Sequence, residues 1–165
     1  MRRSTGRSLP FVTSSPDVWE VIAGEARAES PLWGGALLPR EQREHVPVFS
    51  NLCEPRFALG LETIYEGYLV HYGRPRLFAR REPETMLLLG DYLYAHGLVR
   101  VAAEDDVSAV ADLAELISLA SRLRAEGEGD DGPAWAEAAL GLGSGRQMDD
   151  DTVEEALAAH RLRVG

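Results

Sequence analysis

The chain has 165 residues, 45% of them hydrophobic, so it can bury a core and is not disordered as a whole. It contains 17 basic residues against 27 acidic ones, which gives a formal net charge of −10 at neutral pH. Because binding to phosphate needs clustered cations, this balance argues against nucleic acid as the main partner.

The first 50 residues predict one helix between two irregular segments. Residues 1–14 lack periodicity and carry three arginines, which is typical of a flexible basic tail. Residues 15–17, Ser-Pro-Asp, combine an N-cap hydroxyl, a proline and an acid, so they predict a helix that runs to about Ala28. Residues 31–50 hold three prolines and a glycine pair, so we expect a loop with at most one helical turn over 40–45.

Three long helices follow and are expected to form the core. The first starts at Glu54-Pro55 and keeps apolar residues at helical spacing until Gly73. The second starts at Glu82-Pro83 and is apolar nearly all round, so we expect it to be the central, mostly buried helix. Asp105-Asp106 caps the third, which ends before an acidic, glycine-rich break at Glu126.

Glycines recur at a spacing of seven on two of these helices. Gly60 and Gly67 lie on the first, and Gly90 and Gly97 lie on the second. Each interior glycine costs a helix roughly 1 kcal/mol relative to alanine. The simplest offset is a close approach of the two backbones, so the spacing predicts that these helices pack side by side.

The last forty residues predict a linker and a final helix. Residues 127–148 form an acidic, glycine-rich linker that contains at most a short helix over 134–140. Three aspartates begin a C-terminal helix over 149–165, whose arginines suit the negative end of the helix dipole. Residues 15–126 then form the core domain. With no strand pattern, the predicted fold class is an all-α helical bundle.

The chain carries no recognisable catalytic motif. It lacks a Walker loop, a Rossmann fingerprint and G-x-S-x-G, so we assign no catalytic residue. Cys53 is the only cysteine, which excludes an intrachain disulfide and a cysteine-based zinc site, and we expect a buried, unreactive thiol. The longest apolar run, Met86 to Leu89, is too short to span a bilayer. We therefore predict a cytoplasmic protein without a transmembrane segment.

Two short motifs lie on the first two core helices. Gly73-Arg74-Pro75 ends the first helix, and Gly90-Asp91-Tyr92-Leu93 lies on the second. With this spacing, the stretch from Leu59 to about Leu123 resembles the trans-isoprenyl diphosphate synthases, especially the polyprenyl synthases. In that family an aspartate-rich motif, DDxxD, precedes the first of these motifs. It falls here, without a gap, on residues 62–66, Glu-Thr-Ile-Tyr-Glu.

The resemblance implies part of the isoprenoid synthase fold and candidate site residues. Glu62 and Glu66 would be magnesium ligands, and Arg74 would contact a diphosphate. The chain departs from the family where its chemistry needs charge, because His71 and Tyr72 replace the paired arginines that bind diphosphate. The second aspartate-rich motif would fall beyond residue 165. We therefore expect no prenyl transfer by this chain alone.

Two groups of residues also have a purely structural interpretation. Glu62 and Glu66 lie one turn apart with no cation nearby in the sequence, so two exposed glutamates are the alternative to a metal site. His71 could be a third ligand only if the helix end bends. Asp91 lies in an apolar helix and should have a partner if buried. Its candidate partners are Arg74, Arg76 and His96.

Three functions remain open. The first is a non-catalytic, polyprenyl-synthase-like subunit that acts as partner or scaffold in a homo- or hetero-oligomer. Under this hypothesis Trp33 and the tyrosines at 65, 68, 72, 92 and 94 would suit an interface or an apolar pocket. The second is a small magnesium-dependent protein or enzyme that binds an isoprenoid or a diphosphate through Glu62 and Glu66. The third is an unrelated helical subunit of a larger complex. We predict the first.

Overall fold

The computed structural model describes residues 17–127, 129–143 and 149–165. These residues form seven α-helices and no β-strand, which confirms the all-α prediction. None of the described helices combines the length and apolar composition that crossing a membrane requires. In chain order the helices are α1 (Val18–Glu29), α2 (Pro31–Ala36), α3 (Pro55–Tyr72), α4 (Pro83–Ala102), α5 (Val107–Glu126), α6 (Gly132–Gly141) and α7 (Asp150–Val164), with short 3-10 turns at Arg40–Gln42 and Ser50–Leu52.

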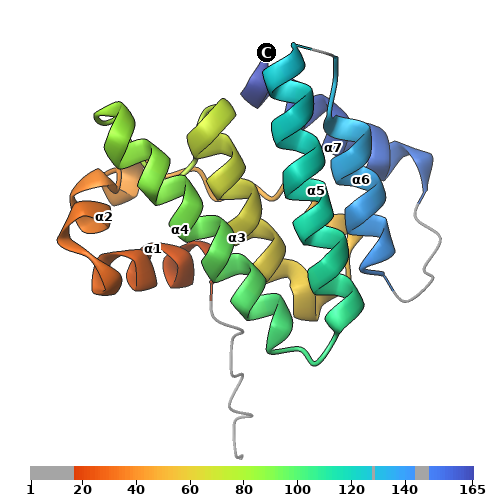
Figure 1. Cartoon of the computed structure of the whole chain (residues 1–165), viewed down its shortest axis with the longest axis horizontal. Coiled ribbons are helices and arrows are strands. Elements are labelled where there is room, and N and C mark those ends of the chain that lie inside the picture. Colours follow the sequence, from red (N-terminus) through yellow and green to blue (C-terminus); the bar gives the residue numbers. More distant parts are fainter. Residues whose placement is uncertain (1–16, 128, 144–148) are drawn as a thin grey trace, which may run out of the picture.

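The helices are arranged around α3. Helices α1 and α2 lie at one end of the molecule, α6 and α7 lie at the other, and α3, α4 and α5 lie between them (Figure 1). Two hydrophobic clusters result. One joins α3 to α5, α6 and α7, and the other joins α1, α2 and α4 to the segment that follows α3. Each cluster therefore covers a different side of the molecule, with α3 in the middle.

Short carboxylate side chains fix several helix starts. Asp106 accepts a hydrogen bond from the backbone N–H of Ala109 at 3.0 Å, and Asp149 accepts one from Thr152 at 2.8 Å. The first helix starts later than predicted, because Asp17 is its N-cap and accepts from the backbone N–H of Trp19 at 2.9 Å. The N-cap role expected for Ser15 lies outside the described residues, as does the predicted basic tail.

Helix α2 lies inside the segment predicted to be a loop. Ser30 accepts a hydrogen bond from the backbone N–H of Leu32 at 3.1 Å, and Pro31 takes the first helical position. Trp33 then packs against the ring of Tyr92 on α4, with 5.9 Å between the ring centres. The loop prediction is wrong here, because this cap and this packing outweigh the low helix propensity of the glycine pair.

Helix α3, and not α4, is the central helix. Every residue from Gly60 to Val70 is buried, whereas Leu87, Leu88 and Val99 on α4 are more than half exposed. The prediction that the second core helix is the central one is therefore wrong. An apolar surface on all sides shows that a helix can be buried, but the neighbouring helices cover only one side of α4.

The predicted glycine contacts between α3 and α4 are confirmed. A Cβ atom added to Gly60 would lie 3.2 Å from the carbonyl oxygen of Gly97, and one added to Gly67 would lie 3.0 Å from that of Gly90. The two backbones therefore touch at both glycine pairs. This contact leaves no room for a prenyl chain between the two helices at these positions.

Replacing Gly97 with alanine is expected to destabilise the fold by about 1–3 kcal/mol. The new Cβ atom would lie 2.9 Å from the carbonyl oxygen of Gly60, so the backbones must separate. Gly24 on α1 is the matched control, because nothing lies within 4 Å of the corresponding position. Gly24→Ala should raise stability by up to about 1 kcal/mol through helix propensity. Urea denaturation measures both, and equal effects would contradict close packing at Gly97.

Helix α6 and helix α7 both contribute to the core. Trp135 of α6 is fully buried against Phe49, and Ala156 and His160 of α7 are buried as well. The segment predicted to be a linker, residues 127–148, thus holds a helix that packs into the core. The part of it at residue 128 and at residues 144–148 lies outside the described residues.

Candidate functional site

The two carboxylates that the resemblance assigns to magnesium share one arginine. Glu62 and Glu66 on α3 are buried together with Arg76. Nη1 of Arg76 lies 2.6 Å from Oε2 of Glu62, and its Nε lies 2.9 Å from Oε2 of Glu66. The interpretation as two exposed glutamates is therefore wrong. The chain turns back at residues 73–75 and brings Arg76 onto α3, and we call these three residues the arginine clamp.

The clamp also binds the backbone around it. The backbone N–H groups of Arg76 and Leu77 both donate to Oε1 of Glu66 at 2.8 Å, and Nη1 of Arg76 donates to the carbonyl of Val46 at 2.9 Å. Burial by itself would lower the pKa of Arg76, but the charges of Glu62 and Glu66 outweigh it and raise that pKa. The guanidinium thus supplies the cation between the two carboxylates. The magnesium assignment stays a prediction.

The other residues of the predicted site do not join the clamp. Arg74 is exposed, its backbone N–H donates to the carbonyl of Arg163 at 2.9 Å, and its diphosphate role stays a prediction. Nε2 of His71 lies 3.2 Å from Oδ1 of Asp91, so the partners expected for Asp91 are wrong. Asp91 is itself exposed and needs no buried partner. Burial lowers the pKa of His71, although the charge of Asp91 opposes this.

The single cysteine is poorly placed to react. Its thiol is half-buried and donates to the carbonyl of Ser50 at 3.3 Å. Burial raises the pKa of Cys53 to about 12, so almost no thiolate is present at neutral pH. The structure thus agrees with an unreactive thiol, though one that is less buried than expected.

A second buried polar network joins four helices around Asp131, at the start of α6. Asp131 accepts hydrogen bonds from the hydroxyl of Tyr68 at 2.6 Å and from Nη2 of Arg124 at 2.7 Å. Nε2 of His160 lies 2.9 Å from Oδ1 of Asp131, and its Nδ1 lies 2.9 Å from the hydroxyl of Tyr65. Tyr65 and Tyr68 are therefore core residues, and the expectation that they line an interface is wrong. We call these five residues the aspartate network.

The aspartate network holds Asp131 as a carboxylate inside the core. Burial by itself would raise the pKa of Asp131, but hydrogen bonds from His160, Arg124 and Tyr68 lower it to about 2. Asp130, Asp131 and His160 each offer one atom that could bind a metal ion, and these three atoms lie within 4.8 Å of one another. Among the described residues this is the single group of three such side chains. The guanidinium of Arg124 already neutralises Asp131. Asp131 and His160 are fully buried, whereas Asp130 is exposed.

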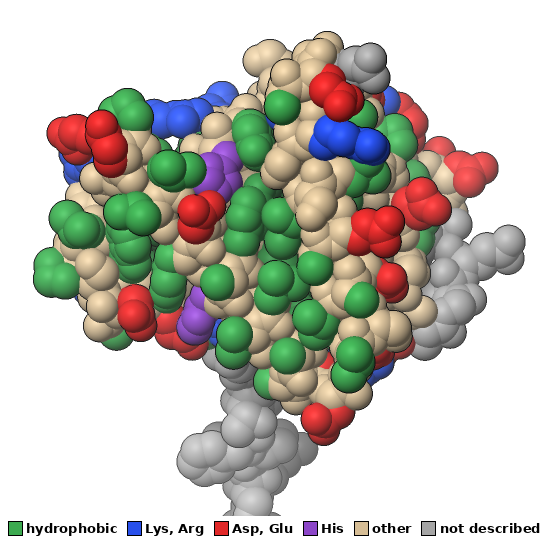
Figure 2. Space-filling view, in the orientation of Figure 1, with side chains coloured by type: hydrophobic (Ala, Val, Ile, Leu, Met, Phe, Trp, Pro, Cys, Tyr) green, Lys and Arg blue, Asp and Glu red, His purple; other side chains and the backbone are tan. Residues whose placement is uncertain are grey.

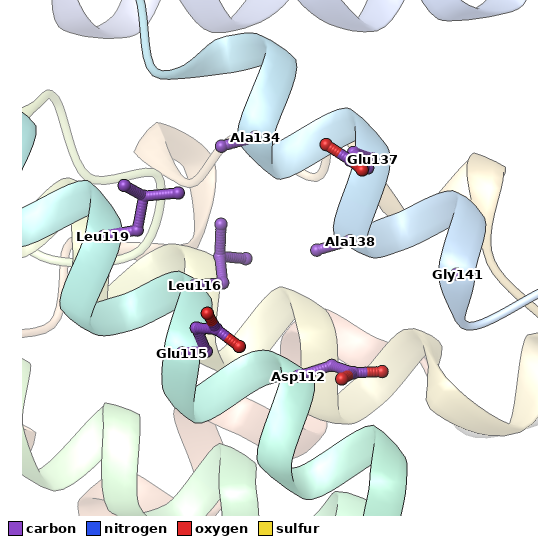
Figure 3. A pocket seen from close by; sticks show the side chains of 8 residues that line it. All are labelled: Asp112, Glu115, Leu116, Leu119, Ala134, Glu137, Ala138 and Gly141. Carbon is purple, nitrogen blue, oxygen red and sulfur yellow. The ribbon is translucent and has the colours of Figure 1, made fainter.

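A groove between α5 and α6 is open to solvent. Its volume is about 410 Å³, and Leu116 and Leu119 project from α5 toward Ala134 and Ala138 of α6 to form an apolar floor (Figure 3). Carboxylates from both helices stand around this floor. The groove, called the α5–α6 groove below, is lined by Asp112, Glu115, Leu116, Leu119, Ala134, Glu137, Ala138 and Gly141. None of these residues was singled out from the sequence.

The net charge of the chain falls in its C-terminal part, which includes the two helices of this groove. Residues 1–103 hold 12 acidic and 12 basic residues, whereas residues 104–165 hold 15 acidic and 5 basic ones. The whole formal charge of −10 therefore belongs to the part of the chain that forms α5, α6 and α7. Such an uneven distribution attracts cationic partners to one part of the surface and leaves the other part neutral.

The outer face of α4 is largely apolar, and none of the described residues covers it. Its exposed residues recur at helical spacings of three and four, and Asp91 is its one formally charged residue between Thr85 and Val99. Figure 2 shows hydrophobic side chains gathered in the middle of the side of the molecule that carries α4 and α5. We call the following exposed residues the α4 face: Leu87, Leu88, Asp91, Ala95, Val99 and Ala102.

No protein-family model, no curated protein and no solved structure matches this chain. The resemblance to isoprenyl diphosphate synthases therefore stays a prediction. Apart from the buried polar networks, two surfaces stand out among the described residues: the α5–α6 groove and the α4 face. Its function has to be inferred from them.

Proposed function

We propose that this protein is a non-catalytic helical subunit that pairs with a second copy of itself through the α4 face. The observation that carries this proposal is the exposure of Leu87, Leu88 and Val99, each more than half accessible on one side of one helix. Leucines and a valine gathered in this way are typical of an interface, because single exposed apolar residues normally stand apart. Val107 at the start of α5 extends the apolar surface.

The α4 face is complementary to itself in an antiparallel arrangement. Leu87 and Leu88 lie toward its N-terminal end, and Val99 and Ala102 lie toward its C-terminal end. A two-fold axis at Ala95 would place Leu88 of one copy against Ala102 of the other, and Asp91 against Val99. The alanine at the axis would allow close approach of the two helices. Such an isologous contact closes on itself and gives a dimer.

The charge distribution favours the same pairing. Helix α4 belongs to the part of the chain whose acidic and basic residues are equal in number, so two copies can approach there without net repulsion. Pairing through α5, α6 or α7 would bring two acidic surfaces together. A stable interface buries about 1,200–2,000 Å² in total, so residues beyond the α4 face must take part as well.

Replacing Leu88 with aspartate is expected to convert the dimer to a monomer. The change removes Leu88 from both copies, and burying each of these leucines contributes about 1.5–3 kcal/mol to dimer stability. The dissociation constant should therefore rise by about a hundredfold or more. Sedimentation velocity over a range of protein concentrations measures the change. Leu162 is the matched control, because it is 79% exposed and belongs to α7 and not to α4. Leu162→Asp should leave the dimer intact.

A cross-link tests the register of the pairing. In a Cys53→Ser background, Ala95→Cys would place two thiols at the two-fold axis, so mild oxidation should give a covalent dimer. Leu162→Cys in the same background should not cross-link. A wild-type protein that remains monomeric at high concentration would rule the proposal out. A dimer that is insensitive to Leu88→Asp would do the same.

A further inference from the structure

We infer that the α5–α6 groove binds an amphipathic helix rich in arginine or lysine, supplied by a partner protein. The inference is independent of the dimer proposed above, because no residue that lines the groove belongs to the α4 face. It rests on three properties of the groove: an apolar floor, acidic walls on both sides and the absence of cationic partners for those walls among the described residues.

The floor of the groove is apolar along its length. Leu116 and Leu119 lie on the α5 side, and Ala134 and Ala138 lie on the α6 side, one helical turn apart on each helix. The alanines keep the α6 wall low, which leaves the space between the helices unfilled by side chains. An apolar stripe on a partner helix, at spacings of three and four residues, fits such a trough.

The walls of the groove carry negative charge from both helices. Asp112 and Glu115 lie one turn apart on α5, and Glu137 lies across from them on α6 (Figure 3). Ion pairs found nearby engage Asp106 and Asp131 instead, and among the described residues these three carboxylates have no cationic partner. Cations on both sides of a partner's apolar stripe would therefore meet carboxylates on both walls.

The occupant follows from this charge pattern. A second copy of the chain has no excess of positive charge in either part of its sequence, and an anionic ligand would be repelled. A basic amphipathic helix satisfies the floor and the walls together. Electrostatic attraction toward residues 104–165, which carry the whole net charge, would also speed its association at low salt.

The test uses a labelled 18-residue peptide with leucines on one face, arginines flanking them and alanines elsewhere. Fluorescence anisotropy with the full chain at moderate salt should show saturable binding. A scrambled peptide of the same composition should bind at least tenfold more weakly, because it cannot present one apolar face. A peptide with glutamates in place of the arginines should not bind.

Two sets of variants locate the site. Asp112→Asn, Glu115→Gln and Glu137→Gln together should weaken binding of the peptide at least tenfold. Asp150→Asn, Asp151→Asn and Glu155→Gln together remove the same charge from exposed positions of α7 and should change binding less than twofold. Leu119→Ala keeps every charge and should weaken binding severalfold through the floor.

Three results would overturn the inference. Equal loss in both triple variants would mean general attraction to an acidic surface. No effect of Leu119→Ala would mean that the floor is not used. Dissociation of the protein's own dimer by the groove variants, seen in sedimentation, would make a second copy the occupant. Each of these can be distinguished from failure of the α4 face, which Leu88→Asp tests separately.

Discussion

Replacing Arg76 with methionine is expected to lower the free energy of unfolding by about 3–5 kcal/mol at neutral pH. The guanidinium is fully buried between Glu62 and Glu66, so its removal leaves two buried carboxylates without a counter-charge. The hydrogen bond to the carbonyl of Val46 and the contact with the Trp19 ring are lost as well. Methionine preserves most of the apolar volume, so the change mainly reports the loss of charge.

Urea denaturation measures this loss against a matched control. Arg74→Met makes the same replacement two residues away at an exposed position, and it should change stability by less than about 0.5 kcal/mol. A second variant separates charge from packing. Glu62→Met added to Arg76→Met removes one unpaired buried carboxylate, so the double variant should be more stable than Arg76→Met alone. If it is less stable, the clamp acts through packing and the electrostatic explanation is wrong.

The helix starts and the packing of α3 against α4 could be predicted from the sequence. Helix boundaries follow from local rules, and the starts at Pro55 and Pro83 were predictable because proline and the preceding glutamate mark them. The side-by-side packing of α3 and α4 was predictable as well, from glycines at a spacing of seven. These features depend on residues close in the chain or on one repeated spacing.

The choice of the central helix was not predictable by hydrophobicity. Helix α3 carries two glutamates and α4 carries apolar residues on every side, so the pattern favours α4 as the buried one. The structure reverses this order because Arg76, ten and fourteen residues after the two glutamates, neutralises them inside the core. The one hint of a buried cation in the sequence is that Arg76 precedes the apolar residues Leu77 and Phe78. This hint does not show that Glu62 and Glu66 are its partners.

The candidate surfaces were hidden from the sequence for a related reason. The α5–α6 groove exists only because α6 packs beside α5, and α6 lies in a segment that composition marks as a linker. The α4 face is visible only once α3 is known to take the central place. The apolar residues on the outer side of α4, which predicted burial, are then seen to be exposed.

The aspartate network gives the second large effect, and it connects stability to the groove. Asp131→Asn is expected to lower the free energy of unfolding by about 3–5 kcal/mol at pH 7. The amide cannot accept charge-assisted hydrogen bonds from Arg124, Tyr68 and His160 together, and it leaves the guanidinium without a counter-charge. Asp150→Asn on the exposed start of α7 is the control and should stay within about 0.5 kcal/mol.

The pH dependence of this loss identifies its cause. The folded protein holds the pKa of Asp131 at about 2, below its ordinary value of 3.8, so the unfolded chain binds the proton more readily. The stabilisation is therefore complete above about pH 4 and is lost as the pH falls through 2, by roughly 2 kcal/mol in all. The difference in stability between wild type and Asp131→Asn should shrink by that amount between pH 5 and pH 2. A constant difference would mean that the aspartate acts by shape alone.

The same variant tests whether the network sets the geometry of the α5–α6 groove. Arg124 lies at the end of α5 and Asp131 precedes α6, so their ion pair holds the two helices together where the chain turns between them. At pH 7, folded Asp131→Asn should bind the basic peptide more weakly than wild type, although no residue of the groove has changed. Unaltered affinity would show that helix packing alone holds the groove open, and the network would then contribute only to stability.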